Sequence, residues 1–239
     1  MTVLLYDLCG RDRDLRFSPY CWRAKMALAH KAVPFETVAT PFTSVPGIES
    51  GASKTVPVIN DDGQVVADSF EIVLYLDRVH PDAPKLFPDA SSVAAAHFLQ
   101  AWAFQALHGI VVRMILKAIH AELGETDQDY FRRSREARFG ETLERHQTGV
   151  APNAEALRTA LDPLRRTLAH HPWLGGDYPR FADYIPFGTL MWLRTINGSL
   201  PLAADDPVLE WFERGLDLHG GLARGAKVAG GGELRLRRE

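Results

Sequence analysis

The sequence contains few cysteines, no long apolar run and no large excess of charge. Its 239 residues include only Cys9 and Cys21, too few for a disulfide framework and not spaced as zinc ligands. No apolar run reaches the roughly 18 residues that a membrane span needs, and the N-terminus lacks the charged-then-apolar order of a secretory signal. The net charge of −3 gives no electrostatic basis for binding nucleic acid. We therefore expect a cytoplasmic protein that holds no metal and binds neither nucleic acid nor membranes.

Several catalytic motifs are also missing. The sequence contains no HExxH, P-loop, GxSxG or GxGxxG pattern, so zinc hydrolysis, nucleotide-phosphate binding and Rossmann-type cofactor binding lose support. Hydrophobic residues at 46% and charged residues at 24% are ordinary for a globular protein. The length of 239 residues predicts one to two domains with a full core.

The first 80 residues alternate between strand and helix signals. Runs at residues 2–6, 35–40, 56–60 and 64–67 are rich in β-branched and apolar side chains. The sequence Asp61-Asp62-Gly63 lies between the last two runs, a spacing typical of a hairpin. One helix is predicted from Pro19, because proline suits the first helical turn, and another from near Asp68. This order predicts a small mixed sheet flanked by helices.

The second half carries helix signals only. Three prolines between residues 80 and 92 indicate an interdomain linker. From Phe98 to Ile119, apolar residues recur every three or four positions, which predicts a long amphipathic helix. Further helices are predicted at about 128–146, 153–170, 183–196 and 207–219, and the tail from Gly220 is expected to be loosely ordered. We therefore expect an α/β domain at residues 1–81, a linker at 82–91 and an all-helical domain at 92–239.

The stretch FSPYCWRAKMALAHK, residues 17–31, opens the first predicted helix with Ser18-Pro19-Tyr20-Cys21. A Cys-x-x-Cys at this place would indicate a redox pair, but the first position is a serine. Ser18 is a natural N-cap, and that structural role alone is sufficient to explain it. The free amides and the dipole of the same helix end also stabilise an anion, including the thiolate of a ligand, to which the Ser18 hydroxyl can donate.

Two further features of the first half fit a ligand that is a thiol peptide. If the bend at Val56-Pro57 exposes the Val56 N–H and C=O, an extended peptide can pair with them as an added strand; a plain strand start is the alternative. Asp68 and Glu71 resemble a capping box. The hydroxyl of Ser69 at the same helix start also suits a carboxylate, and Asp68 suits an ammonium. Together these groups fit the α-amino-acid end of a peptide.

These residues resemble the glutathione transferase superfamily, in which a thioredoxin-like N-terminal domain precedes an all-helical domain. SPYCWRAK is also similar to the glutaredoxin site CPYC with its first cysteine replaced. The resemblance implies a thioredoxin-like domain with a mixed four-stranded sheet, a helical-bundle domain, glutathione as cosubstrate, and a homodimer packed through both domains. It assigns to glutathione the following residues: Ser18 for the thiolate, Val56 and Pro57 for the peptide backbone with Pro57 in the cis form, Asp68 and Ser69 for the γ-glutamyl group, and Lys54 for the glycine carboxylate.

The second half resembles the bacterial β-aryl-etherase group of this superfamily, at residues 181–192 and 206–224. The wider family has Ser or Thr three residues ahead of the buried aspartate that matches Asp183, whereas this chain has Arg180. The resemblance therefore implies that Asp183 keeps its folding role without the usual hydroxyl cap.

The predicted reaction is attack of the glutathione thiolate on a small hydrophobic electrophile, and the likeness to β-aryl-etherases favours an aromatic one. A free thiol with a pKa of about 8.5 is mostly protonated at neutral pH, so hydroxyl donation and the helix dipole raise the thiolate fraction. In an etherase-like version the attacked carbon carries an aryloxy group and a phenolate leaves. The electrophile pocket is expected between the domains, where the long helix offers Trp102, Leu107, His108, Val111 and Ile115, although core packing is the simpler explanation for each one taken singly.

Other interpretations remain open for several of these residues. A glutaredoxin-like thiol oxidoreductase would use Cys21, which lacks a resolving partner at position 18. A non-catalytic binder of apolar ligands would use the same interdomain cleft. His108 can assist a leaving group, but a lone histidine in an apolar helix is more often structural. Arg11, Arg13 and Arg16 can attract a carboxylate, yet they alternate with aspartates as in a solvated loop.

Overall fold

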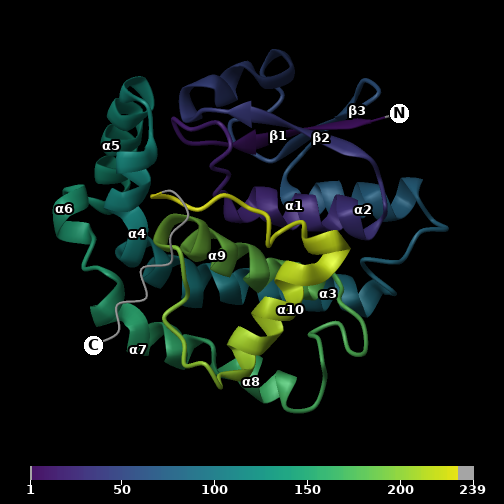
Figure 1. Ribbon diagram of the computed structural model, residues 1–239. Helices are drawn as coiled ribbons and strands as arrows, with labels where there is room; N and C mark the ends of the chain where they lie inside the picture. Colours follow the sequence, from purple (N-terminus) through teal and green to yellow (C-terminus); the bar gives the residue numbers. More distant parts are fainter. Residues whose placement is uncertain (1, 231–239) are drawn as a thin grey trace.

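The first half of the chain forms a four-stranded mixed sheet, as the sequence predicts (Figure 1). A computed structural model describes residues 2–230. The strands are β1 (Val3–Leu8), β2 (Phe35–Thr40), β3 (Val58–Asp61) and β4 (Gln64–Ala67), in the order β2-β1-β3-β4. β1 pairs with β2 in parallel, and with β3 in antiparallel. The hairpin of β3 and β4 turns through Asp62 and Gly63, both with positive φ, which explains the Asp-Gly pair at this position.

Two helices of the first half pack beside each other on the sheet. These are α1 (Pro19–His30) and α2 (Ser69–Val79). The kinked 3₁₀-helical segment η1 (Phe42–Ser50) connects β2 to β3. The side chains of Leu5 and Ile59 in the sheet and of Ala24 and Leu28 in α1 are all 0% exposed. Burial of these apolar groups is the main force that holds α1 against the sheet, and it fixes the direction in which the first turn of α1 faces.

The second half is helical throughout the part that the structure describes. Its elements are α3 (Ala90–Trp102), the π-helical turn η2 (Ala103–His108), α4 (Gly109–Glu122), α5 (Glu125–Phe139), α6 (Leu143–His146), α7 (Val150–Ala160), α8 (Asp162–Leu168), α9 (Phe181–Asn197) and α10 (Pro207–Gly221). The helix expected at 128–146 is divided, because Gly140 with φ of +72° ends α5. The helix expected at 153–170 is divided between Ala160 and Asp162, and Pro163 lies in the first turn of α8.

Among residues 2–230, one helical stretch, Ala90–Glu122, is long and apolar enough by length and composition to cross a membrane. It comprises α3, η2 and α4, and it packs against α9 and α7 inside the helical half. This packing is that of a core helix in a helical bundle. The N-terminal part of the stretch is mostly uncovered, since Ala96 is the one buried residue of α3.

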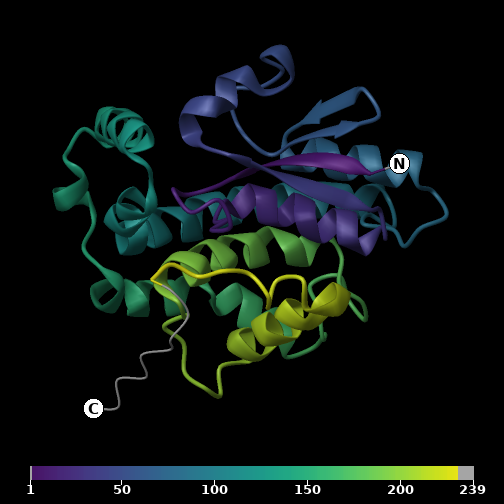
Figure 2. The same ribbon diagram turned by 45° about the horizontal axis from the view of Figure 1, so that its top comes forward.

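The contact between α1 and α9 joins the two halves of the chain. Figure 2 shows α1 between the sheet and α9. The approach is close because position 188 in α9 is glycine: a Cβ there would lie 2.3 Å from the Pro19 carbonyl oxygen and 3.1 Å from Cγ of Arg23. The absence of a side chain therefore lets α9 rest directly on the first turn of α1.

Asp183 in the first turn of α9 is a buried acceptor for several segments. Its carboxylate is 1% exposed and accepts hydrogen bonds from the N–H groups of Leu174, Gly175 and Arg180 and from the Trp211 indole, at 2.7–3.0 Å. Burial raises the pKa of this carboxyl group. A guanidinium has no acceptor atom, so the Arg180 side chain cannot return the bond as Ser or Thr would. Half of the reciprocal capping arrangement is thus retained, and Asp183 keeps its folding role.

Residues 222–230, which follow α10, are more firmly attached than we expect from their glycine content. Ala223 is 0% exposed, and the Ala229 N–H donates to the Thr195 carbonyl of α9 at 2.7 Å. The predicted loose order from Gly220 is therefore wrong for residues 222–230, because backbone hydrogen bonds and a buried alanine hold this segment on the helical half. Residues 231–239, which belong to the same predicted tail, lie outside the described residues.

Candidate functional site

Ser18 caps the N-terminus of α1 while its own proton stays available. The Ser18 Oγ accepts a hydrogen bond from the Cys21 N–H at 3.2 Å, and the backbone at Ser18 is extended, as in an N-cap. Among residues 2–230 the Ser18 hydroxyl donates to no oxygen or nitrogen atom, and the neighbouring Cys21 sulfur is a weak acceptor. A hydroxyl can accept and donate at once, so the structural role and the proposed catalytic role are compatible. The free amides of the first turn add positive potential at the same place.

The two cysteines are both inside the protein. Cys21 and Cys9 are each 0% exposed, and burial raises the pKa of both thiols. For Cys21, the carboxylate of Asp7 raises the pKa further. The thiolate is the reactive form of cysteine, so a buried, protonated Cys21 disfavours the oxidoreductase interpretation. Cys21 is a packed thiol in the first turn of α1.

Val56 and Pro57 precede β3 and present a free backbone edge. The Val56–Pro57 peptide bond is cis, as the family resemblance implies. Val56 is half-buried, and within residues 2–230 neither its N–H nor its C=O has a hydrogen-bond partner. The Pro57 carbonyl accepts the Asp68 N–H at 3.2 Å, which connects this edge to the start of α2. An extended peptide can therefore pair with Val56 beside α2.

Asp68 and Ser69 lie at the N-terminus of α2 and differ in how they are engaged. The Asp68 carboxylate is exposed and accepts the N–H groups of Phe70 at 2.7 Å and Glu71 at 3.3 Å. The predicted capping box is incomplete, because the Asp68 N–H bonds to Pro57 and not to Glu71. Ser69 is 1% exposed, and its hydroxyl is buried with no partner among the described residues. A buried, unpaired hydroxyl at a helix N-terminus is suited to a ligand carboxylate. Lys54 is exposed in the loop before the cis bond.

The apolar residues predicted for the electrophile pocket divide into two groups. Leu107, Val111 and Ile115 are 0%, 0% and 1% exposed, so they pack in the core and have no surface to offer a ligand. Trp102 is half-buried, and His108 is 8% exposed. The core-packing explanation thus holds for three of the five.

His108 is the centre of an aromatic cluster that also contains Tyr20, Phe104 and Trp192. The His108 ring centroid lies 5.5 Å from that of Tyr20 and 5.7 Å from those of Phe104 and Trp192. The His108 Nε2 shares a hydrogen bond of 3.0 Å with the Thr189 hydroxyl. Burial, with smaller effects of Arg23 and Arg138, lowers the pKa of His108 to about 3, so the imidazole is neutral at pH 7. Tyr20 comes from the same helical turn as Ser18, which brings this cluster close to the helix start.

Three members of this cluster were absent from the sequence-based prediction. Tyr20 lies inside the Ser-Pro-Tyr-Cys stretch and Trp192 inside the FADYIPFGTLMW stretch, but sequence alone does not show toward which neighbour each ring points. Phe104 lies three positions before Leu107, a spacing that predicts the same buried face, yet it is 51% exposed. The feature that marks this cluster is a large apolar ring exposed next to half-buried aromatic rings, and exposure cannot be read from the sequence.

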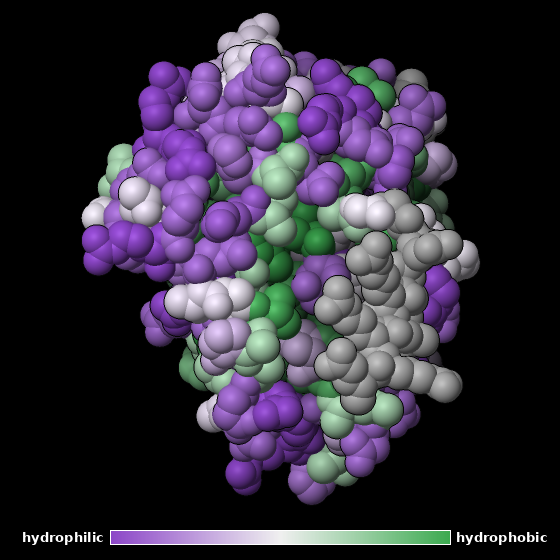
Figure 3. Space-filling view, turned by 60° about the vertical axis from the view of Figure 1, so that its left-hand side comes forward, coloured by the Kyte–Doolittle hydropathy of each residue, from purple (hydrophilic) through white to green (hydrophobic). Residues whose placement is uncertain are grey.

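The side of the molecule that carries α5 and α6 has exposed apolar surface. In Figure 3, hydrophobic residues form a strip down the middle of this face, between hydrophilic residues above, below and to the left. Contiguous apolar surface of this kind is typical of a place where a ligand or partner binds.

Arg23 is a fully buried cation beside the same cluster. It is 1% exposed, its guanidinium lies 4.6 Å from the Tyr20 ring centroid, and it donates to the Gln100 Oε1 at 3.1 Å. Burial lowers the pKa of Arg23 to about 10, which still leaves it charged at pH 7. Since Gln100 belongs to α3, this hydrogen bond joins the two halves of the chain at the edge of the site.

Comparison with known proteins gives consistent results along the chain. Residues 17–79 match the family described as Glutathione S-transferase, N-terminal domain, and residues 94–204 match Glutathione S-transferase, C-terminal domain. A probable maleylacetoacetate isomerase of Caenorhabditis elegans is 34% identical over 110 residues, which cover 43% of this chain and about half, 51%, of that protein. A probable glutathione S-transferase, GSTU6, of Oryza sativa subsp. japonica is 25% identical over 82% of this chain and 80% of its own length.

Solved structures of similar fold cover nearly the whole chain. The glutathione S-transferase CsGST63524 of Ceriporiopsis subvermispora, solved with glutathione, has a TM-score of 0.77 at 24% identity, over 92% of this chain and 96% of its own. The β-etherase LigF of Sphingobium sp. strain SYK-6 has a TM-score of 0.67 at 18% identity, over 94% and 99%. These similarities confirm the fold predicted from the sequence, a thioredoxin-like domain followed by a helical domain. Both family matches and the fold agree, and the chain belongs to the glutathione S-transferase superfamily.

Proposed function

We propose that this protein is a glutathione transferase in which Ser18 stabilises the glutathione thiolate for attack on a hydrophobic electrophile. The observation that carries the proposal is the Ser18 hydroxyl at the N-terminus of α1: its oxygen accepts the Cys21 N–H, and its proton goes to no oxygen or nitrogen atom among residues 2–230. Because that hydrogen bond holds the oxygen in place, little reorganisation is needed when a thiolate arrives.

The remaining glutathione contacts follow from the free groups around Ser18. We assign the Val56 N–H and C=O to the cysteinyl backbone and the buried Ser69 hydroxyl to the γ-glutamyl carboxylate. The exposed carboxylate of Asp68 is available to the γ-glutamyl ammonium, and Lys54 to the glycine carboxylate. The crystal structure of CsGST63524 contains glutathione, which supports glutathione as the thiol peptide for this chain as well.

We place the electrophile beside the cluster of Tyr20, Phe104, His108 and Trp192. Aromatic rings with exposed edges bind apolar and aromatic groups, and Tyr20 connects the cluster to the thiolate site. In the reaction the sulfur forms a bond to an electrophilic carbon and the leaving group departs with the bonding electron pair. Where that group is an aryloxy group, the products are a thioether and a phenolate, which is the β-aryl-ether cleavage that the second half of the sequence favours. The fold shared with LigF is consistent with this outcome.

The test is a pair of variants, Ser18→Ala and Cys21→Ala, assayed with glutathione and both an aryl halide and a β-aryl ether. Loss of one hydrogen bond to a charged group is worth about 1.5–3 kcal/mol, so kcat/KM of Ser18→Ala should fall about 10- to 150-fold. The pH profile of kcat/KM should also move to higher pH, since the bound thiol loses a donor to its anion. Cys21→Ala should retain activity. Loss of activity in the cysteine variant alone would reject the assignment of Ser18, and failure to bind glutathione would reject the proposal.

We also propose that the protein is a homodimer. α3 faces outward for most of its length, and Phe98 on it is 73% exposed, while Val79 at the end of α2 is 40% exposed. Large apolar side chains exposed on both halves of the chain are typical of a protein–protein interface. A second copy that covers α3 would account for the apolar character of a helix that is mostly uncovered in the single chain.

A further inference from the structure

His108, at the centre of the aromatic cluster that we assign to the electrophile, engages its two ring nitrogens differently. Nε2 shares a hydrogen bond of 3.0 Å with the hydroxyl of Thr189, which is 0% exposed. Nδ1 has no hydrogen-bond partner among residues 2–230, and it does not belong to the fully buried polar atoms that lack a partner in this part of the chain. Nδ1 therefore keeps an accessible surface at which a ligand can bind.

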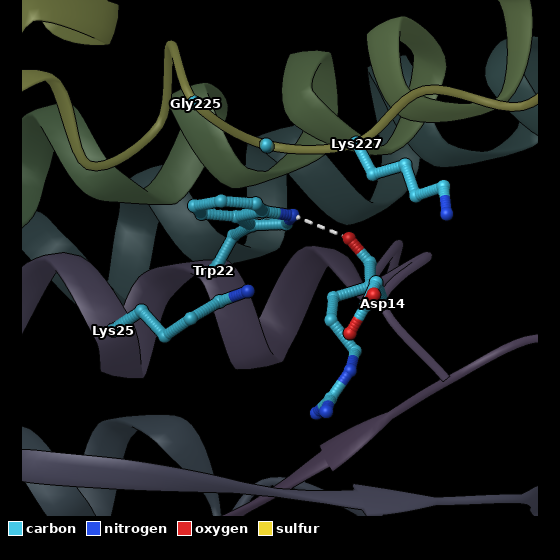
Figure 4. Close-up of a pocket in the computed structure, with 7 residues that line it drawn as sticks. Asp14, Trp22, Lys25, Gly225 and Lys227 are labelled. Carbon is cyan, nitrogen blue, oxygen red and sulfur yellow. Dashed lines mark hydrogen bonds between the residues drawn. The ribbon is translucent and has the colours of Figure 1, made fainter. Parts of the chain in front are cut away.

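A cavity of about 380 Å³ elsewhere in the protein, between the loop after β1, α1 and the segment after α10, offers no comparable group. Figure 4 shows Trp22 in this cavity between the Lys25 ammonium and the segment at residues 225–227. Trp22 is 2% exposed, and the Lys25 Nζ lies 3.4 Å from its ring centroid. The buried Asp7 carboxylate is 2.9 Å from the Lys25 Nζ and 3.7 Å from the Arg16 Nη1. The ring and these cations are thus engaged within the protein.

The rings around His108 leave surface for a flat ligand. Phe104 is 51% exposed, and Tyr20 and Trp192 are half-buried. The centroids of these three rings lie 5.5–5.7 Å from that of His108, with interplanar angles of 51–60°, so none of them is stacked flat on the imidazole. Aromatic rings bind other aromatic groups by offset or edge contacts. A ligand ring can therefore contact the exposed side of this cluster.

The π-helical turn η2 gives a separate structural reason for a ligand site here. Hydrogen bonds in a π-helix join residues five apart instead of four, so the apolar stripe of the long helix shifts at η2. This shift explains why Phe104 is exposed although Leu107, three positions later, is 0% exposed. Single π-helical turns within α-helices occur frequently at functional sites.

The Thr189 hydroxyl determines which nitrogen of His108 carries the proton. It also lies 3.5 Å from the Ile185 carbonyl oxygen, a usual acceptor for a threonine one helical turn later. With the proton on Nε2, His108 donates to Thr189 and Thr189 donates to Ile185, so two hydrogen bonds form. With the proton on Nδ1, Thr189 must donate to Nε2, the bond to Ile185 is lost, and the Nδ1 proton has no acceptor among residues 2–230. The first arrangement is favoured, and it leaves Nδ1 as an acceptor.

His108 is uncharged in this arrangement. Burial, together with Arg23 and Arg138, lowers the pKa of His108 to about 3. A ring nitrogen without a proton accepts a hydrogen bond but cannot donate one, so Nδ1 has no proton to give to a leaving group at pH 7. The arrangement therefore disfavours the leaving-group role that the sequence left open for His108, and the accessible nitrogen suits a ligand group that donates.

We propose that the electrophile is a neutral aromatic molecule that carries a hydroxyl group, and that this hydroxyl donates a hydrogen bond to His108 Nδ1. Thr189 is a positioning residue, because its hydroxyl fixes the tautomer of His108. A methyl ether presents only acceptor lone pairs to Nδ1, so it should be disfavoured relative to the hydroxyl. The inference rests on the proposed function in one respect, namely that the ligand of this cluster is the electrophile.

Two-bond proton–nitrogen-15 correlation spectra of the full chain at pH 7 test the tautomer, because they distinguish protonated from unprotonated ring nitrogens. Loss of signals in His108→Phe identifies those of His108. We expect the proton on Nε2 in the parent and in Thr189→Ser, which keeps a hydroxyl. In Thr189→Val the Nε2 proton loses its acceptor, so the form with the proton on Nδ1 should grow. The control Thr195→Val alters another fully buried threonine of α9, whose hydroxyl donates to the Met191 carbonyl, and it should keep the parent tautomer.

Equilibrium dialysis of the same variants in excess glutathione tests the ligand preference. The probes are 2-naphthol, 2-methoxynaphthalene and the apolar reference 2-methylnaphthalene. His108→Phe should weaken 2-naphthol relative to 2-methylnaphthalene about 2- to 12-fold, since one hydrogen bond is lost. Thr189→Val should tighten 2-methoxynaphthalene relative to 2-methylnaphthalene by a factor in the same range, because a proton on Nδ1 can donate to the ether oxygen. Loss of folding cannot imitate this gain.

Several outcomes would overturn the proposal. These are a proton on Nδ1 in the parent, absence of saturable 2-naphthol binding, and a preference for 2-naphthol that His108→Phe leaves unchanged. A parent-like tautomer in Thr189→Val would reject Thr189 as the positioning residue. Neither measurement requires turnover, so these failures are distinguishable from failure of the proposed transferase reaction, which the Ser18 variant tests.

Discussion

Replacing Asp183 with alanine should strongly destabilise the chain. The carboxylate is 1% exposed and accepts four hydrogen bonds, three from the backbone at Leu174, Gly175 and Arg180 and one from the Trp211 indole. Hydrogen bonds to a charged group are worth about 1.5–3 kcal/mol each, so four contribute about 6–12 kcal/mol. Desolvation of the buried carboxylate opposes this by several kcal/mol, and breaking a buried charged arrangement typically costs about 3–5 kcal/mol. We expect a net loss within that last range.

Urea-induced unfolding, followed by tryptophan fluorescence, measures the loss. With a slope of about 3 kcal/mol/M for a chain of this size, the midpoint of Asp183→Ala should fall by about 1–1.7 M. Asp183→Asn should lose less, because the amide keeps one oxygen as an acceptor. The control Asp162→Ala removes an exposed ion pair with Arg166 and should change stability by less than about 0.5 kcal/mol. An Asp183→Ala midpoint within about 0.2 M of the parent would refute the reasoning.

Three further predictions concern the domain contact, acid stability and assembly. Gly188→Ala places a Cβ 2.3 Å from a carbonyl oxygen in the first turn of α1, so the free energy of unfolding should fall by about 1–3 kcal/mol. The control is Gly109→Ala, whose Cβ would have no atom within 4 Å, and it should not destabilise the chain. Burial lowers the pKa of His30 from 6.5 to about 4, so below pH 6.5 the unfolded chain binds more protons than the folded chain and stability falls. His30→Gln should therefore flatten the decline in the urea midpoint between pH 6.5 and 5, and an unchanged slope would contradict this. Phe98→Asp on α3 should convert a dimer to a monomer in light scattering at an unchanged urea midpoint, and a persistent dimer would exclude this face.

The sheet could be predicted from the sequence because its signals are local. β-Branched runs and the Asp62-Gly63 turn each act over a few residues, and the structure shows the strands and the hairpin at those places. The start of α1 at Pro19 is similarly local, since a serine cap and a proline at the first helical position both favour it. The residues that we propose for glutathione binding lie at the ends of these same elements.

The electrophile side of the site could not be predicted to the same extent. Leu107, Val111 and Ile115 recur at helical spacing, but the same spacing describes a stripe in a core and a stripe along a cleft. The structure buries all three and brings His108 together with Phe104 and other rings of distant elements. Contacts between elements far apart in sequence decide which apolar stripe faces a ligand. The periodicity of apolar residues does not predict these contacts.

The contact at Gly188 restricts how members of this superfamily can be recombined. Since α9 lies directly on the first turn of α1, a chimera that joins this first domain to the helical domain of a relative places a new neighbour against the turn that carries Ser18. A helical domain with any larger residue at the position of Gly188 would displace the first turn of α1 even in the absence of substrate. The choice of helical domain would then affect the activity that we propose for Ser18, a residue that the other parent supplies.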